Sequence, residues 1–236
     1  MHKFLAALLL SILLPASFGT AEAGSFTVTP TRLSMTGAVD TGVITLRNTA
    51  STSAVIQVES FAWTDSPSIA ELEPTRDILA VPTVFKLQPD EKQVVRVRAR
   101  TRPGAVEKAY RIVLSEVPQL QNGASNGVQF ALRLSLPVFI GPPGVKASPS
   151  WFVERGGSGD DRPWLRLSNG GEAHLHLTEL EVTDDTGREI VGLASGPVYV
   201  LPGRAHRFAL PDGRIQWPLR VEGKTNLGKV QVDIDG

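Results

Sequence analysis

The chain of 236 residues contains no cysteine and carries no net charge. The absence of cysteine excludes disulfides, thiolate zinc sites, iron–sulfur clusters and cysteine nucleophiles. Because 24 Lys and Arg residues balance 24 Asp and Glu residues, there is no overall basic excess of the kind that nucleic-acid binding usually needs. Long helical patterns are scarce, whereas Gly (22) and Pro (17) are numerous. This composition favours a globular all-β protein that does not bind nucleic acid.

Motifs for catalysis are also missing. None of the common fingerprints of nucleophilic enzymes, metallohydrolases, phosphate-binding loops or dinucleotide-binding folds occurs, so we expect no catalytic residue, no cofactor and no enzyme. His174 and His176 share one face of a predicted strand, but only Glu172 or Glu179 could supply a third metal ligand. We therefore expect no metal site, and we expect Asp160-Asp161 and Asp184-Asp185 to form solvated turns rather than calcium loops.

Residues 1–23 have the layout of a secretory signal peptide. A basic start precedes a short apolar run, and the small residues Ala21 and Ala23 form a cleavage signal before Gly24. The run is shorter than the roughly 20 apolar residues that span a bilayer comfortably, and no later run is long enough. The sequence thus predicts export without membrane insertion.

Alternation of apolar and polar residues dominates the rest of the chain. It predicts strands at 25–35, 42–48, 53–63, 78–89, 93–100, 109–118 and 128–142, a spacing typical of an immunoglobulin-like sandwich. Pro30 marks the first of them as an edge strand or a strand that changes sheets.

The remaining residues repeat this pattern in a shorter form. Strands ending in Asn48 and Asn169, each followed later by a Pro-containing turn, suggest one architecture used twice. The Pro- and Gly-rich stretch between the two parts has no hydrophobic period. The predicted units are listed in chain order: signal peptide 1–23, N-terminal domain 24–142, hinge 143–148 and smaller C-terminal domain 149–236.

Several arginines could bind an anion. For Arg96, Arg98, Arg100 and Arg102, which fall on one side of a strand, we favour a solvent-facing role. Arg111 and Arg133 instead interrupt apolar strand patterns, and Arg32 follows Pro30 near the end of the first strand. An internal salt bridge would explain each of them, but their convergence at one cleft would create a carboxylate receptor, because the guanidinium fork binds both oxygens.

The strand near 128–136 carries an apolar row on one face. A half-buried sandwich strand would look the same as an edge strand that offers this row to another protein by β-augmentation. The residues of the row that would be offered are Val128, Phe130, Leu132 and Leu134.

In combination, several segments resemble the periplasmic chaperones of the chaperone–usher pilus pathway. These are the signal peptide, P-T-R at 30–32, G-x-x-x-L-R-N at 42–48, the basic strand at 87–98, E-K-A-Y-R-I-V-L-S-E-V-P at 107–118 and the run at 131–142. The resemblance implies two immunoglobulin-like β-sandwich domains in an L-shaped arrangement. It also implies a periplasmic location and, as partners, exported pilus subunits and an outer-membrane usher.

The same resemblance implies roles for the residues singled out above. A strand at about 126–138 would complete a subunit that lacks its last strand, with Val128, Phe130, Leu132 and Leu134 as donor residues. Arg111 would anchor the subunit's C-terminal carboxylate, with Arg32 and Arg133 as second choices. The better-known branch has a Lys where this chain has Pro137. Members of the archaic branch instead carry a Tyr-Arg pair in the preceding strand. Tyr110-Arg111 matches that pair, so the chain resembles the archaic branch.

Two other classes remain as alternatives. One is a secreted all-β pilus subunit or adhesin, against which two domains argue. The other is a carbohydrate-binding or metal-binding accessory domain, for which the four tryptophans are too scattered. The sequence leaves open whether the free chaperone caps itself as an oligomer.

Overall fold

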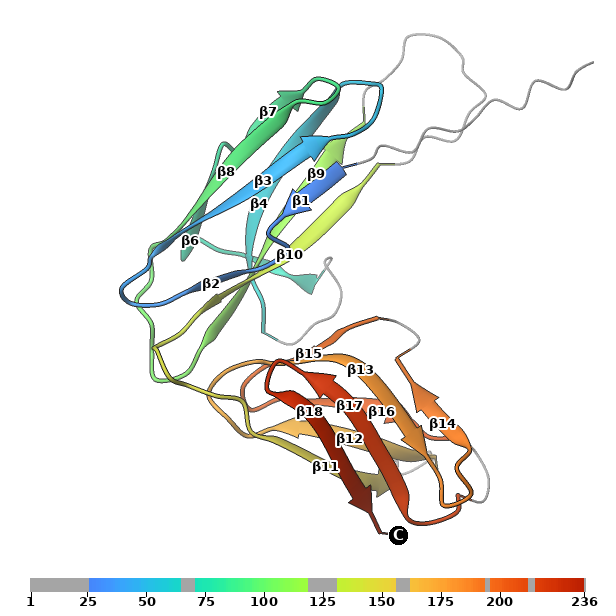
Figure 1. Cartoon of the computed structure of the whole chain (residues 1–236). Helices are drawn as coiled ribbons and strands as arrows, with labels where there is room; N and C mark the ends of the chain where they lie inside the picture. The colour runs from blue at the N-terminus through green and yellow to red at the C-terminus, as the bar shows by residue number, and fades with distance from the viewer. Residues whose placement is uncertain are drawn as a thin grey trace, which may run out of the picture.

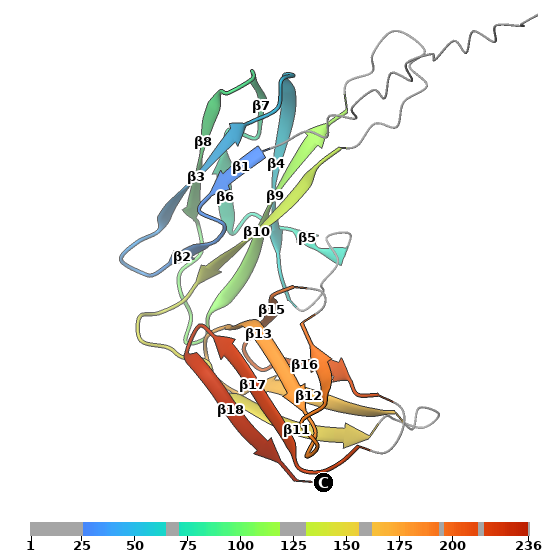
Figure 2. The ribbon, with the colours of Figure 1, turned by 45° about the vertical axis from the view of Figure 1, so that its right-hand side comes forward.

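The computed structural model describes residues 26–64, 71–118, 131–155, 162–193, 196–211 and 215–235. Within these ranges the chain forms strands and no α-helix, and hence no helix long and apolar enough to cross a membrane. Two β-sandwiches meet at an angle and give the molecule an L shape (Figures 1 and 2). The predicted all-β class and the L-shaped pair of sandwiches are therefore confirmed.

The N-terminal sandwich consists of two mainly antiparallel sheets. The first has the order β1 (Phe26–Thr29), β3 (Thr41–Asn48), β8 (Lys92–Ala99) and β6 (Ile78–Val81). The second has the order β2 (Leu33–Met35), β10 (Arg133–Ile140), β9 (Lys108–Val117), β4 (Ala54–Ala62) and β5 (Glu73–Pro74), and β7 (Val84–Leu87) also pairs with β4.

The chain changes sheets at two prolines. Pro30 separates β1 in the first sheet from β2 in the second, and Pro82 separates β6 from β7 in the same way. Proline has no N–H to donate, so a ladder stops there and the chain is free to take another partner. The switching role predicted for Pro30 is confirmed, and β2 joins the second sheet as a parallel neighbour of β10.

Strand β8 shows how alternation builds the core. Val95, Val97 and Ala99 are buried between the sheets, whereas the arginines between them are exposed. Arg98 forms only an exposed ion pair with Asp40. The solvent-facing interpretation of this arginine series is thus confirmed.

The C-terminal sandwich has its own core. One sheet has the order β11 (Pro149–Arg155), β12 (Pro163–Asn169) and β16 (Ala205–Ala209). The other has the order β14 (Glu189–Gly192), β13 (Leu175–Thr183), β17 (Leu219–Thr225) and β18 (Gly228–Ile234), and β15 (Val198–Val200) also pairs with β13. Its buried side chains form a cluster separate from that of the N-terminal sandwich.

Asn48 and Asn169 occupy equivalent positions in the two sandwiches. Each is almost fully buried, and each side-chain amide donates to two backbone carbonyls, one of them four residues later in the chain. The backbone carbonyls of the two asparagines accept hydrogen bonds from the backbone N–H groups of Asp90 and Gly203, each of which directly follows a proline. Both of these turn residues have positive φ, 62° and 70°. The internal repeat suggested by the sequence is a structural repeat.

Asp184 differs from expectation because it is buried rather than solvated, with 4% of the residue exposed. Its carboxylate accepts from the Thr186 hydroxyl and from the backbone N–H groups of Thr186 and Arg188. These bonds, that from the Thr186 hydroxyl above all, lower the pKa of Asp184. A buried carboxylate is tolerated here because the turn's own donors satisfy Oδ1 and the Arg188 guanidinium lies 3.3 Å from Oδ2. Asp160 and Asp161 lie outside the described residues.

Candidate functional site

Strand β10 has an incomplete edge. It pairs with β9 over its whole length, but β2 covers its other side only from Val138 to Ile140. Residues 133–137, called the free edge below, therefore have no strand beside them within the described part of the chain. Leu132 accepts a hydrogen bond from Glu116 on β9 at 2.8 Å. By antiparallel alternation, the backbone groups of residues 133, 135 and 137 then point toward the open side.

An apolar hollow lies at the start of the free edge. Among the predicted donor residues, Leu132 and Leu134 line this hollow together with Phe26 and Leu114. Leu134 also packs against the core of its own sandwich. Val128 and Phe130 lie outside the described residues. Leu132 and Leu134, the described members of the apolar row, therefore lie where the two sheets of the N-terminal sandwich separate.

Two of the three predicted arginines lie level with each other at the far end of the free edge. Arg111 on β9 is directly opposite Pro137. Leu33 on β2 is opposite Val138, so the preceding residue, Arg32, comes level with Pro137 on the other side of β10. Arg32 and Arg111, the arginine row below, therefore straddle the point where the free edge ends and β2 begins.

Arg111 lies against aromatic rings and forms no ion pair within the described residues. Its neighbours Tyr110 and Ile112 are buried in the core, so alternation turns Arg111 to the outer face of the sheet. The guanidinium carbon is 3.5 Å from the centre of the Trp63 ring and 5.9 Å from that of Tyr199, a cation–π arrangement. Burial lowers the pKa of Arg111 to about 10, so it stays charged at neutral pH.

Arg32 is exposed and faces the C-terminal sandwich. The pKa of His176 on β13 is lowered by burial first, and then by the charges of Arg32 and His174. The His176 ring stacks on Tyr199, with centroids 4.1 Å apart. Arg111 on β9 and Arg32, just before β2, therefore both lie near the aromatic group around Tyr199. Arg32, like Arg111, has no ion pair in the described part of the chain.

Arg133 is placed differently from the arginine row. It is exposed and lies on the same face of the sheet as Arg111. However, it is opposite Ser115 and four residues along β10 from Pro137, a separation of about 13 Å at ~3.3 Å per residue. The structure brings Arg32 and Arg111 together but leaves Arg133 at the other end of the free edge, also without an ion pair among the described residues.

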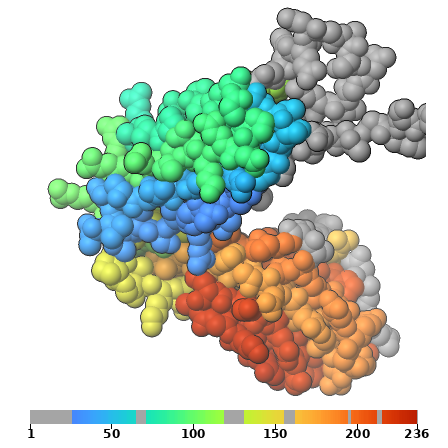
Figure 3. Space-filling view, turned by 45° about the horizontal axis from the view of Figure 1, so that its top comes forward, coloured from blue at the N-terminus to red at the C-terminus, as the bar shows by residue number. Residues whose placement is uncertain are grey.

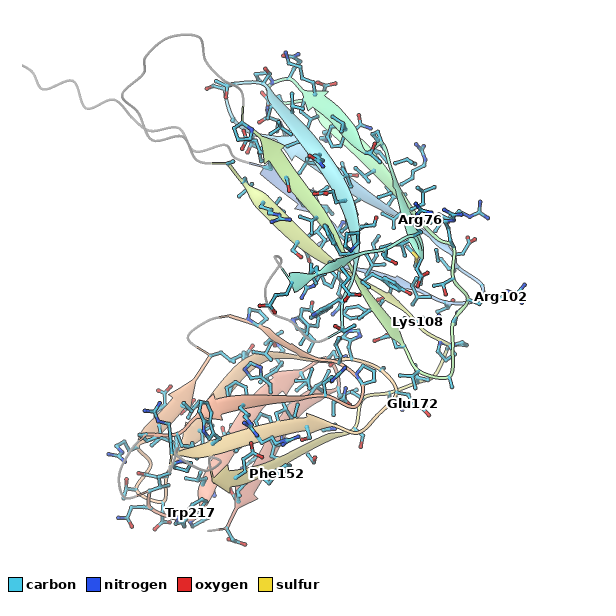
Figure 4. The ribbon with its side chains drawn as sticks, turned by 180° about the vertical axis from the view of Figure 1, so that it is seen from behind. Arg76, Arg102, Lys108, Phe152, Glu172 and Trp217 are labelled. Atoms are coloured by element: carbon cyan, nitrogen blue, oxygen red, sulfur yellow. The ribbon has the colours of Figure 1, made fainter. Side chains whose placement is uncertain are left out.

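The arginine row lies at a junction between the two sandwiches. Trp63 and Phe139 from the N-terminal sandwich pack with Leu201 and Tyr199 from the C-terminal one. Figure 3 shows the blue N-terminal strands in contact with the orange and red C-terminal ones. Seen from behind, Lys108 and Glu172 lie close to this junction, whereas Trp217 lies at the far end of the molecule (Figure 4). The tryptophans do not gather into a platform.

A carboxylate and a histidine connect the sandwiches at the junction. Glu107, just before β9, accepts from the backbone N–H of His174 at 2.8 Å and lies 2.7 Å from its Nδ1. The His174 ring also stacks on Phe139, with centroids 3.6 Å apart. The histidine pair therefore belongs to an interdomain contact, not to an exposed strand face, and no cluster of metal ligands occurs among the described residues.

Neither Trp63 nor Tyr199 stood out in the sequence as a site residue. A signal for Trp63 was present, since the alternation of β4, continued one residue past its end, places Trp63 on the same outer face as Phe61. An isolated sandwich would expose this face. Tyr199 gave no signal, because Trp63 and Phe139 belong to a different sandwich and lie 60 or more residues away in sequence.

The family comparison agrees with this geometry. The family described as pili and flagellar-assembly chaperone, PapD N-terminal domain, matches residues 25–146, which is more than half of the chain. The chain belongs to this family of pilus-assembly chaperones, which is not a family of enzymes. Membership also disfavours the alternative of a pilus subunit. No curated protein matches the sequence.

Solved structures share the fold across nearly the whole chain. The chaperone CsuC, in complex with the tip subunit CsuE of archaic pili of Acinetobacter baumannii, is 20% identical, with a TM-score of 0.66, covering 89% of this chain and 98% of that one. The Salmonella enterica chaperone SafB, in complex with the pilin SafA, is 16% identical, with a TM-score of 0.65 and coverage of 90% and 97%. The periplasmic chaperone SfaE is 15% identical, with a TM-score of 0.60 and coverage of 90% and 100%.

Proposed function

We propose that this chaperone binds exported pilus subunits that lack their last strand, supplies that strand from its own chain in the periplasm, and delivers them to an outer-membrane usher. The observation that carries the proposal is the meeting of an unpaired strand edge with two unpaired arginines. CsuC and SafB are each described in complex with a pilus subunit, and SfaE is described as periplasmic; these descriptions support the same partner and location here.

The sheet geometry supports the anchoring role of the arginine row. A guest strand that pairs with the free edge must stop before Val138, because β2 occupies the edge from there on. For a guest strand that runs parallel to β10, the last residue then falls level with Pro137, next to Arg111 and Arg32. A terminal carboxylate at this point meets two cations that have no other acid to bind among the described residues. Charge-assisted hydrogen bonds of this kind contribute about 1.5–3 kcal/mol each.

We assign Arg111 as the main anchor because it is the more buried of the two and is held against Trp63. Arg32 is the second choice, and Arg133 remains a third, nearer the middle of a bound strand. The donor residues are Val128, Phe130, Leu132 and Leu134. Since Leu134 already packs on its own core, Leu132 is the described residue best placed to reach a guest.

The unpaired backbone groups at an exposed strand edge explain why such a subunit needs a partner. A sandwich that lacks one strand exposes backbone donors and acceptors beside an apolar groove, and such edges aggregate. Strand addition satisfies the backbone while alternate side chains fill the groove. No nucleotide is required, since a later exchange for a subunit's own segment gives the more stable product. Self-capping of the free chaperone would use the same edge.

The remaining proposals concern the whole chain. We propose cleavage of residues 1–23 on export, domains at 24–142 and 149–236, and a hinge at 143–148. The likeness to CsuC and the pair Tyr110-Arg111 are consistent with the archaic branch. Delivery to an outer-membrane usher rests on family membership.

Co-expression with a candidate subunit tests the proposal. Arg111→Ala should abolish the co-purified complex while the chaperone stays folded by circular dichroism. Arg96→Ala is the matched control, because Arg96 is an exposed arginine on the opposite sheet and its loss should change nothing. A complex of normal yield with Arg111→Ala would contradict the anchor assignment.

A further inference from the structure

Tyr199 is the point where the C-terminal sandwich reaches the arginine row. It lies on β15, yet its ring packs against Trp63 and Phe139 of the N-terminal sandwich, each with centroids 5.7 Å apart. It also lies 5.9 Å from the Arg111 guanidinium carbon. Tyr199 therefore belongs to the surroundings of the cation even though another domain supplies it.

The hydroxyl groups of the two tyrosines differ in their hydrogen bonding. The Tyr110 hydroxyl donates to Asp77 at 2.8 Å, and this bond is internal to the N-terminal sandwich. The Tyr199 hydroxyl makes no hydrogen bond within the described residues, although the residue is half-buried. A phenol between aromatic rings and a cation, with its donor unused, is suited to a ligand that carries negative charge.

We propose that the Tyr199 hydroxyl donates a hydrogen bond to the same terminal carboxylate that Arg111 binds, so that the anchor is complete only when both sandwiches contribute. This inference rests on the proposed function. It adds a cross-domain residue that selects an ionised chain end over a neutral one.

The electrostatics of the site favour a neutral donor at this position. Arg111 and Arg32 already supply two positive charges that no acid among the described residues matches, and a third cation would repel both. A phenol adds a hydrogen bond to an ionised acceptor without that cost. Stacking on Trp63 also leaves the edge of the Arg111 guanidinium plane free, so the fork and the phenol can address one carboxylate together.

The test uses the mature full-length chaperone and two synthetic peptides. Both are 12-residue peptides of alternating Thr and Val, one with a free C-terminal carboxylate and one with a C-terminal amide, and their affinities are measured by titration calorimetry. Tyr199→Phe removes only the hydroxyl and keeps the ring. We expect it to weaken binding of the acid peptide roughly 10-fold or more, to leave the amide peptide unchanged and to leave thermal unfolding unchanged.

Tyr110→Phe is the matched control, because Tyr110 and Tyr199 are the two tyrosines of the chain. Losing the Asp77 bond should lower thermal stability but leave the preference for acid over amide intact. If Tyr199→Phe weakens both peptides equally, or neither, the inference is wrong. If it has no selective effect while Arg111→Ala removes the preference, the proposed function stands and this inference alone fails. If the unaltered chaperone shows no acid preference, both fail.

Discussion

Asn48 and Asn169 show how one buried polar residue can organise each sandwich. Each closes the end of a central strand by linking it to the turn that precedes a later strand. A buried amide is favourable only when its donors and acceptor are satisfied, and here the amide nitrogens and the side-chain oxygens all have partners.

Replacing either asparagine with alanine should therefore destabilise the sandwich that contains it. Asn48→Ala leaves the carbonyl of Thr52 and the buried carbonyl of Leu87 without that donor, and we expect a loss of about 2–4 kcal/mol in the free energy of unfolding. Asn169→Ala should act similarly on the C-terminal sandwich. Urea unfolding measures both, and exposed Gln231→Ala should stay within about 0.5 kcal/mol of the parent. Equal stability of all three would show that the amides are dispensable.

Stability should also depend on pH through two histidines. Burial is the largest cause that lowers the pKa of His176, and it is the cause that lowers the pKa of His206. The unfolded chain binds protons more readily at these two histidines than the folded chain does. The stability that the neutral histidines allow is therefore fully present above the ordinary histidine pKa of 6.5, and it is lost as the pH falls below that value. Urea midpoints should thus decrease from pH 7.5 to pH 5.5.

The double variant His176→Gln, His206→Gln should flatten this dependence. The range from pH 5.5 to pH 7.5 lies above the ordinary aspartate pKa of 3.8, and the pKa of Asp184 is lowered further still. Titration of Asp184 therefore does not contribute to the slope in this range. A midpoint that rises on acidification, or an unchanged slope in the double variant, would contradict the assignment.

At the scale of single residues, the sequence predicted which residues belong to the site better than it predicted where they lie relative to one another. Arg111 was identifiable because a cation within an apolar strand needs a partner, and Arg32 by its place after Pro30 near the end of the first predicted strand. Their convergence was not derivable, since it depends on the register of β2 and β9 against β10. The burial of Asp184 escaped prediction because it depends on local turn donors that alternation does not describe.

Strand β10 is the element on which the function depends, and its two edges have different roles. Its β9 side holds the sheet together, whereas residues 133–137 leave their other side open. Pro137 fits this arrangement, because a proline is tolerated where the missing N–H would have pointed away from a paired neighbour.

A second proline on the open side should therefore separate binding from folding. We expect Ser135→Pro to leave the chaperone soluble and folded, because the Ser135 backbone points to the free edge. It should reduce the yield of co-purified subunit, because one ladder hydrogen bond to the guest is lost and the ring obstructs pairing. Ser135→Ala keeps the N–H and should give normal yield. An insoluble Ser135→Pro protein would mean that this position faces β9 instead.

Most elements of the N-terminal sandwich were predictable from period-2 alternation and from proline positions. Pro30 marked one sheet change in advance, since a proline breaks a ladder, whereas the change at Pro82 was not predicted, because residues 78–89 were predicted as one strand. The free edge was not predictable as such. A half-buried strand and a donor strand have the same apolar and polar pattern, and only the length of β2 decides between them.

At the scale of the whole molecule, the junction fixes how the two sandwiches face each other. Separate cores imply that each could pack alone, so their relative orientation depends on few contacts. Glu107 is central among these, because its side chain binds His174 and its backbone N–H donates to Glu172 at 2.9 Å. Both partners belong to the C-terminal half.

Removing the Glu107 carboxylate should loosen this orientation without unfolding either sandwich. In Glu107→Ala, the backbone N–H and Nδ1 of His174 lose their carboxylate partner, and an unpaired buried donor costs about 1–3 kcal/mol. Stacking of His174 on Phe139 remains, so we expect a wider distribution of interdomain angles rather than complete separation. Small-angle X-ray scattering should show a larger maximum dimension, with far-ultraviolet circular dichroism unchanged.

Glu172→Ala is the matched control for this experiment, because Glu172 contacts Glu107 through its backbone and its side chain is exposed. Its scattering profile should match that of the parent. Since Tyr199 reaches Arg111 only while the sandwiches stay docked, Glu107→Ala should also reduce the preference for a free chain end over an amidated one. A scattering profile identical to the parent's would show that the aromatic contacts alone hold the angle, and Glu107 would then have no part in positioning Tyr199.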